Sequence, residues 1–172
     1  MDLSNRPGVD MPVFQPNLAP REVAEKNVVL FSEGFYEDLK PDNVCRRLNE
    51  RVTAFDYDGQ SITIEFEIGD WMLNSWGSLH GGLTAMCADM TSGALSRILC
   101  DTYAPTVTMT MSYLRAAKAN DTLSVTAQAL HLGRRNAHFR TEVRSKKTGE
   151  LLASGTAIHY VGGEKCTKEN AK

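Results

Sequence analysis

Asp89 is the residue whose position most suggests chemistry. It is the only Asp, Glu, Lys or Arg between Trp71 and Ser96, and it lies well inside a segment expected to be a buried helix. Removing an unpaired carboxylate from water costs several kcal/mol, so such a group must be hydrogen-bonded or lose its charge. We interpret it as a functional carboxylate. The alternative is a structural Asp that accepts hydrogen bonds from Thr91 and Ser92.

The start of the same predicted helix can bind an oxyanion. His80, Gly81 and Gly82 stand where backbone N–H groups are free and where the helix dipole is positive. Glycine lets a ligand carbonyl come close to the backbone, His80 or Ser78 can cap the helix, and Asn74 adds an amide donor. The alternative for the two glycines is a tight turn.

Two groups of cations could hold phosphate. Arg134 and Arg135 follow Gly133, and Arg115 and Lys118 come after an earlier predicted strand. Arginine suits phosphate because its planar guanidinium binds two oxygens at once. The alternative is a solvated sheet edge, since charged side chains also alternate outward on the next strand, at Arg140, Glu142 and Arg144.

The cysteines indicate neither a metal site nor a disulfide framework. The chain has four, with no C-x-x-C pair and no histidine at metal-ligand spacing. We therefore expect reduced thiols and no metal. Cys87, on the predicted helix, could be a nucleophile, but a buried cysteine more often behaves as a small hydrophobic residue.

The elements that must position these residues follow from hydrophobic periodicity. Apolar and polar residues alternate from Ile62 to Ile68, again from 106 to 113, and then near 123–127, 137–143 and 151–160, which predicts strands separated by turn residues. From His80 to about Leu99 the chain is free of proline and apolar on most of its circumference, which predicts a buried helix. Strands, one buried helix and further strands indicate an α+β fold in which the sheet curls around the helix.

The whole chain predicts one domain with appendages. At 172 residues it can bury a substantial core. Four prolines in residues 1–20 indicate an extended or disordered arm, residues 21–50 a helical extension, 51–161 the main domain, and 162–172 a polar tail. A net charge of −2, with no block of like charge, argues against a nucleic-acid partner. No membrane span or secretory signal is evident, so we expect a cytoplasmic protein or one of an organelle matrix.

Three segments together resemble a known family. They are NSWGSLHGG at 74–82, Ala88-Asp89, and TVTMTMSYLRAAK at 106–118. In motif, spacing and strand order they are similar to the PaaI-type and thioesterase superfamily member 2-like hotdog thioesterases, over roughly residues 50–161. The resemblance implies the hotdog fold, acyl-CoA thioesterase activity, and no cofactor beyond the coenzyme A of the substrate.

The resemblance also assigns roles. Asp89 matches the catalytic carboxylate, which would act as a general base on water or as a nucleophile. Asn74 matches the amide that contacts the thioester or the water, and Gly81 the donor that polarises the thioester carbonyl. Thr106 falls where a serine helps to hold water, and its branched side chain is more restricted in χ1. The carboxylate of one subunit works with the helix start of another, which implies a homodimer assembling to a homotetramer. Trp76 could reshape the acyl pocket or simply pack.

Two other functions stay open at this point. A non-catalytic acyl-CoA-binding protein would keep the fold and pocket without a working carboxylate. A hotdog dehydratase or hydratase would need a histidine paired with an acid, in a context that the sequence lacks.

Overall fold

The sheet and the long helix form as the periodicity predicts. The computed structural model describes residues 15–33 and 39–164. The sheet strands are β1 (Arg51–Asp56), β2 (Ser61–Glu67), β3 (Thr106–Tyr113), β4 (Thr122–Leu132), β5 (Asn136–Ser145) and β6 (Leu151–Tyr160). The helices are α1 (Arg21–Ser32), α2 (Val44–Leu48) and α3 (Gly81–Cys100), with a short 3-10 turn at Asp70–Met72.

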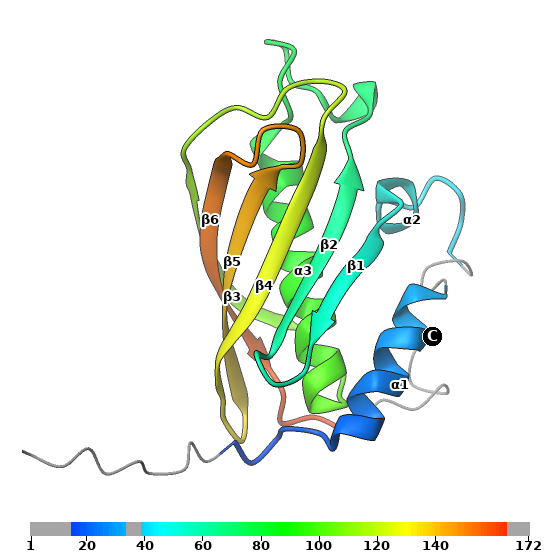
Figure 1. Cartoon of the computed structure of the whole chain (residues 1–172), viewed down its shortest axis with the longest axis vertical. Helices are drawn as coiled ribbons and strands as arrows, with labels where there is room; N and C mark the ends of the chain where they lie inside the picture. The colour runs from blue at the N-terminus through cyan, green and yellow to red at the C-terminus, as the bar shows by residue number, and fades with distance from the viewer. Residues whose placement is uncertain (1–14, 34–38, 165–172) are drawn as a thin grey trace, which may run out of the picture.

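All six strands form one antiparallel sheet in the order β1-β2-β4-β5-β6-β3. The sheet curves around α3, which connects β2 to the far edge strand β3 (Figure 1). The two edge strands are therefore β1 and β3. This arrangement confirms the predicted α+β fold.

The core lies between the concave face of the sheet and one side of α3. Ile62, Ile64 and Phe66 on β2 are almost completely buried, as are Leu95 and Leu99 on the helix. At about 25 cal/mol per Å² of apolar surface, each such side chain contributes roughly 1.5–3 kcal/mol by burial. The packing fixes the rotation of α3 about its own axis.

One face of α3 departs from the prediction that the helix is buried all round. Within a single chain the helix is covered by the sheet and by α1. The remaining stripe is partly exposed and consists of Gly82, Ala85, Met86, Asp89, Met90, Gly93 and Arg97. The spacing of three and four residues places these positions on one face. That face is largely small and apolar, with Asp89 its single acid.

The part of the N-terminal arm that the structure describes has no helix or strand, but it docks. The Asn17 side chain donates to the carbonyls of Gly133 and Arg134, both at 2.8 Å, and the Ala19 N–H donates to the Leu99 carbonyl at 2.6 Å. These contacts tie residues 15–20 to the β4–β5 turn and the end of α3. The predicted arm before residue 15 and the tail after 164 lie outside the described residues.

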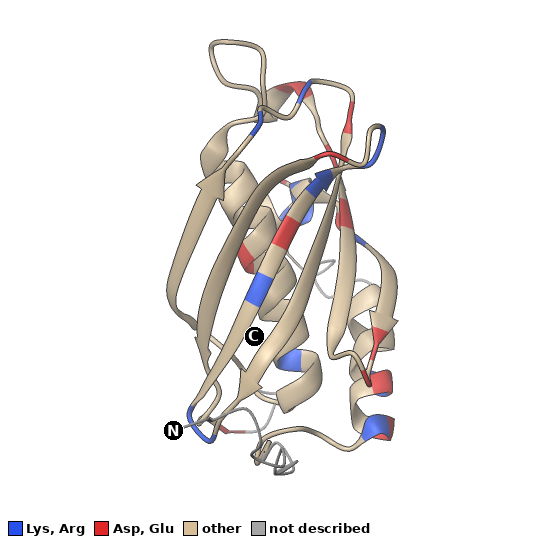
Figure 2. Cartoon of the chain, turned by 60° about the vertical axis from the view of Figure 1, so that its left-hand side comes forward, with Lys and Arg blue, Asp and Glu red and all other residues tan. Residues whose placement is uncertain are grey.

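Charges of both signs are interspersed over the sheet and helices (Figure 2). On β5, for example, Arg144 pairs with its neighbour Glu142 at 2.9 Å. None of the described helices is long and apolar enough to span a membrane.

Candidate active site

The structure brings Asp89 and Thr106 together. Asp89 lies on the partly exposed face of α3, Thr106 begins the edge strand β3, and the Thr106 hydroxyl donates to Oδ1 of Asp89 at 2.7 Å. The second oxygen, Oδ2, has no hydrogen-bond partner among the described residues. A carboxylate oriented by a hydroxyl and open on one side can accept a proton from water.

The geometry does not support the alternative that Asp89 is a structural residue bonded to Thr91 and Ser92. The Thr91 hydroxyl donates to the Cys87 carbonyl at 2.8 Å, and the Ser92 hydroxyl lies 2.9 Å from His159. Neither hydroxyl donates a hydrogen bond to the Asp89 carboxylate. Asp89 is only half-buried in the single chain, so the expectation that the fold removes it from water is wrong for one copy.

The start of α3 is capped by a side chain and leaves one backbone donor open. His80 is the N-cap: its Nδ1 accepts the Gly82 N–H at 3.1 Å. The Gly81 N–H has no acceptor among the described residues, and it stands at the positive end of a 20-residue helix. Of the donors predicted there, Gly81 is thus open, whereas Gly82 already bonds to His80.

Asn74 organises the loop before the helix. Its Oδ1 accepts the Trp76 N–H at 2.9 Å and the Ser78 N–H at 3.2 Å, and its Nδ2 donates to the Ser78 hydroxyl at 3.0 Å. One of the two amide hydrogens is therefore used within the loop, and the other can face a ligand. Gly77, with φ of +72°, allows the turn that brings Ser78 back to Asn74.

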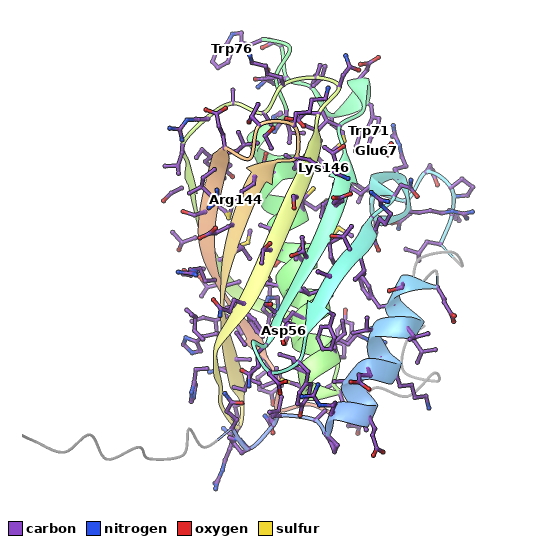
Figure 3. The ribbon with its side chains drawn as sticks, in the orientation of Figure 1. Asp56, Glu67, Trp71, Trp76, Arg144 and Lys146 are labelled. Carbon is purple, nitrogen blue, oxygen red and sulfur yellow. The ribbon has the colours of Figure 1, made fainter. Side chains whose placement is uncertain are left out.

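Trp76 does not pack in the single chain. Its side chain is 89% exposed at the tip of the loop formed by residues 74–78, pointing away from the body of the protein (Figure 3). The interpretation of plain packing is thus wrong within one copy. A role in shaping the acyl pocket stays a prediction.

The two halves of the predicted site are separated along α3. Gly81 and Asp89 are eight residues apart, which at 1.5 Å per residue is about 12 Å along the axis. A thioester carbonyl and its attacking water require groups within about 3 Å of the reacting atoms. One chain therefore cannot apply its own Gly81 and its own Asp89 to the same bond.

The predicted cations fall at opposite ends of α3. Arg115 lies near the helix start; it bonds to the Leu151 carbonyl at 3.1 Å and lies 3.7 Å from Glu150. Arg134 and Arg135 form the exposed β4–β5 turn, which Asn17 ties to the segment that docks on the other helix end. The structure does not bring the two groups together within one chain.

Cys87 is not an activated nucleophile. The residue is fully buried, and desolvation, followed by the nearby Glu50 carboxylate, raises the pKa of its thiol to about 12. The nucleophilic form, the thiolate, is therefore scarce at neutral pH. In the described part of the chain, no three His, Cys, Asp or Glu side chains are placed to hold a metal ion.

Tyr113 is a site residue that the sequence analysis did not single out. Its hydroxyl donates to the Gly81 carbonyl at 3.0 Å, and a side chain at Gly81 would begin 3.4 Å from its ring. The ring is half exposed at the end of β3, and it fixes the first residue of α3. Only its place in the resembling segment marks it in the sequence.

Comparisons with known proteins agree on family and fold. Residues 77–152 match the family model of the thioesterase superfamily. Acyl-coenzyme A thioesterase 13 of Mus musculus is 30% identical over 118 residues, which cover 67% of this chain and 84% of the mouse protein.

Solved structures of similar proteins have the same fold. Zebrafish thioesterase superfamily member 2 superposes with a TM-score of 0.68 at 26% identity, over 78% of this chain and 96% of that one. The PaaI protein of E. coli, from the phenylacetic acid degradation operon, has a TM-score of 0.71 at 22% identity, over 85% of this chain and 98% of its own. The hotdog fold predicted from the sequence is thereby confirmed.

Proposed function

Because this chain belongs to the thioesterase superfamily, we propose that it is an acyl-CoA thioesterase, which hydrolyses an acyl- or aryl-CoA thioester to the free acid and coenzyme A. The observation that carries the proposal is the hydrogen bond from Thr106 to Asp89 on the open face of α3. It leaves a carboxylate held in one orientation and accessible to water.

The complete site requires two copies of the chain. The open face of α3 is mostly small and apolar, and the edge strand β3 exposes Val107 by 60% and Tyr113 by 54%. An uncovered apolar edge strand favours pairing with another strand. A two-fold axis near Ala85, midway between Gly81 and Asp89, would place the Asp89 of each copy opposite the Gly81 of the other.

In such a dimer the reaction needs no further group. Asp89 removes a proton from water, the resulting hydroxide attacks the thioester carbon, and the Gly81 N–H with the Asn74 amide of the other copy stabilises the oxyanion. Collapse of the intermediate breaks the carbon–sulfur bond, and the coenzyme A thiolate leaves and takes up a proton. A positioned base contributes about 10²–10⁴-fold and each oxyanion donor about 10²–10³-fold.

The alternative course is direct attack by Asp89 to form an acyl anhydride. The bond from Thr106 orients the carboxylate, but it weakens Asp89 as a base and as a nucleophile alike, so the choice between the two courses needs an experiment. In a single turnover in H₂¹⁸O, label found in Asp89 would show direct attack by Asp89, with water then opening the anhydride at the aspartyl carbon. The base mechanism places the label only in the product acid.

The dimer also assigns a role in phosphate binding to Arg134 and Arg135. With α3 helices antiparallel, the β4–β5 turn of one copy lies toward the helix start of the other. Arg134 and Arg135 would then face the coenzyme A phosphates bound at the other copy's Gly81, with Arg115 as a second cation. A homotetramer and a cytoplasmic or organelle-matrix location stay predictions from the sequence.

A panel of acyl- and aryl-CoA thioesters, with released thiol measured, tests the function. We expect turnover of at least one class and oligomers by light scattering. Tight binding of the thioesters without hydrolysis would instead identify a non-catalytic acyl-CoA-binding protein. A monomer with full activity would refute the shared site.

A further inference from the structure

A buried histidine lies directly behind the Asp89–Thr106 pair. His159 is on β6, is 1% exposed, and packs its ring edge-to-face against Phe139 with centroids 5.5 Å apart. Both ring nitrogens are hydrogen-bonded. Nε2 lies 2.9 Å from the Ser92 hydroxyl, and Nδ1 lies 3.1 Å from the Ala104 carbonyl.

One of these partners lies on α3, and the other lies in the loop just before β3. Ser92 follows Asp89 by three residues on α3, so the two are neighbours on the helix surface. Ala104 precedes Thr106 by two residues, and Thr106 is the register partner of His159 across the β3–β6 ladder. One imidazole therefore joins the helix of the carboxylate to the loop residue two positions before the hydroxyl.

The hydrogen positions follow from the partners. A carbonyl can only accept, so Nδ1 of His159 carries the hydrogen that is donated to Ala104. Burial lowers the pKa of His159, while the Ala104 carbonyl and the charge of Asp89 raise it to a smaller extent, and the ring is neutral near pH 7. Nε2 then accepts from Ser92, although the same hydroxyl also lies 3.1 Å from the Asp89 carbonyl.

The start of β3 needs such a link because the ladder there is weak. β3 is an edge strand with β6 as its one neighbour, and its register shifts between Thr106 and Thr108. Regular strand pairing therefore does not fix how far Thr106 lies from α3. The hydrogen bonds of His159 to Ser92 and to Ala104 set the distance between the start of β3 and α3.

We propose that His159 is a positioning residue, which bridges Ser92 and Ala104 and thereby holds the Thr106 hydroxyl against Asp89. The expected effect on kcat rests on the proposed thioesterase function. The expected effect on the distance between Asp89 and Thr106 rests on the geometry alone. Because His159 is only 1% exposed, it acts through the pair and not by contact with the substrate.

The test uses two matched variants of the same helix. Ser92→Ala removes one end of the bridge. Ser96→Ala is the control, because Ser96 is equally buried on α3 and its hydroxyl has no hydrogen-bond partner among the described residues. His159→Gln is a third variant: its short amide cannot span both Ser92 and Ala104.

Rates are compared per folded molecule at a common temperature below each melting point. We expect Ser92→Ala and His159→Gln to lower kcat by up to about tenfold, no more than Thr106→Val does, with KM changed less than twofold, since small displacements of a catalytic pair are costly. Ser96→Ala should keep the unchanged protein's kcat. Thr106→Val should lower kcat much less when it is added to Ser92→Ala than when it is made alone, because the Asp89–Thr106 pair is already displaced in Ser92→Ala.

A crystal structure of each variant gives the Asp89 to Thr106 distance, whatever the activity. If the unchanged protein hydrolyses no thioester, the proposed function fails, and a longer distance in Ser92→Ala alone still supports the bridge. An unchanged distance in Ser92→Ala and His159→Gln would overturn the bridge. If the variants melt at a lower temperature but keep the kcat of the unchanged protein, His159 has only a structural role in the core.

Discussion

Replacing Glu50 with glutamine should stabilise the protein above pH 7 and have little effect near pH 4. Glu50 lies between α2 and β1, and its buried Oε2 has no hydrogen-bond partner among the described residues. Burial raises the pKa of the carboxyl from 4.5 to about 7. Between these values the unfolded chain is ionised while the folded protein keeps its proton, so stability falls as pH rises.

The size of the effect follows from the two pKa values. Each pH unit between them is worth about 1.4 kcal/mol, which gives an upper limit of about 3.4 kcal/mol above pH 7. Because the side chain is only partly buried, solvent screening reduces this, and we expect about 1–2 kcal/mol.

Urea unfolding at pH 4 and pH 8, at one protein concentration, measures the difference. Glu50→Gln should raise the free energy of unfolding at pH 8 and leave it nearly unchanged at pH 4. Glu67→Gln, at an exposed carboxylate, is the control and should follow the unchanged protein. Equal effects of Glu50→Gln at both pH values would refute the assignment of a buried, unpartnered acid.

Three further changes test other parts of the account. Thr106→Val should lower kcat about tenfold and Thr106→Ser should not, because only the hydroxyl orients Asp89; steady-state rates compare them. Asn17→Ala should lower the free energy of unfolding by about 1–3 kcal/mol, since two hydrogen bonds to the β4–β5 turn are lost, as urea titration would show. Replacing Arg134 and Arg135 with alanine should raise KM more than it lowers kcat, and the effect should shrink with added salt; an unchanged KM at low salt would place the phosphates elsewhere.

Strands and the long helix could be predicted because their periodicity is strong. The alternation from Ile62 to Ile68 gives β2 nearly to the residue. The alternation on β4 suggested a shorter strand than Thr122–Leu132, because a register shift between Ala129 and His131 breaks the period of two. Local irregularity of this kind carries no simple sequence signal.

The burial of α3 was over-predicted for a physical reason. Glycine, alanine and methionine suit a core and a contact between chains equally well, so composition alone cannot tell the two apart. The resemblance gave Asp89 and Thr106 separate roles, but periodicity could not predict that their side chains, 17 residues apart in the chain, are hydrogen-bonded.

His159 had a usable signal that the sequence analysis did not use. It falls in phase with Ala153 and Ala157 on the inward face of β6, where a polar residue must find partners. Its bonds to Ser92 and Ala104 could not be predicted, because they depend on how the sheet closes on the helix over a separation of 67 residues in one case and 55 in the other.

The turnover of Asp89→Asn per folded molecule, on a thioester that the unchanged protein hydrolyses, tests the central claim most directly. Asparagine keeps the shape and removes the basic site. If Asp89 is the base, kcat falls by at least about 10²-fold while the melting temperature stays similar or rises. Near-normal turnover of the folded variant would contradict the mechanism.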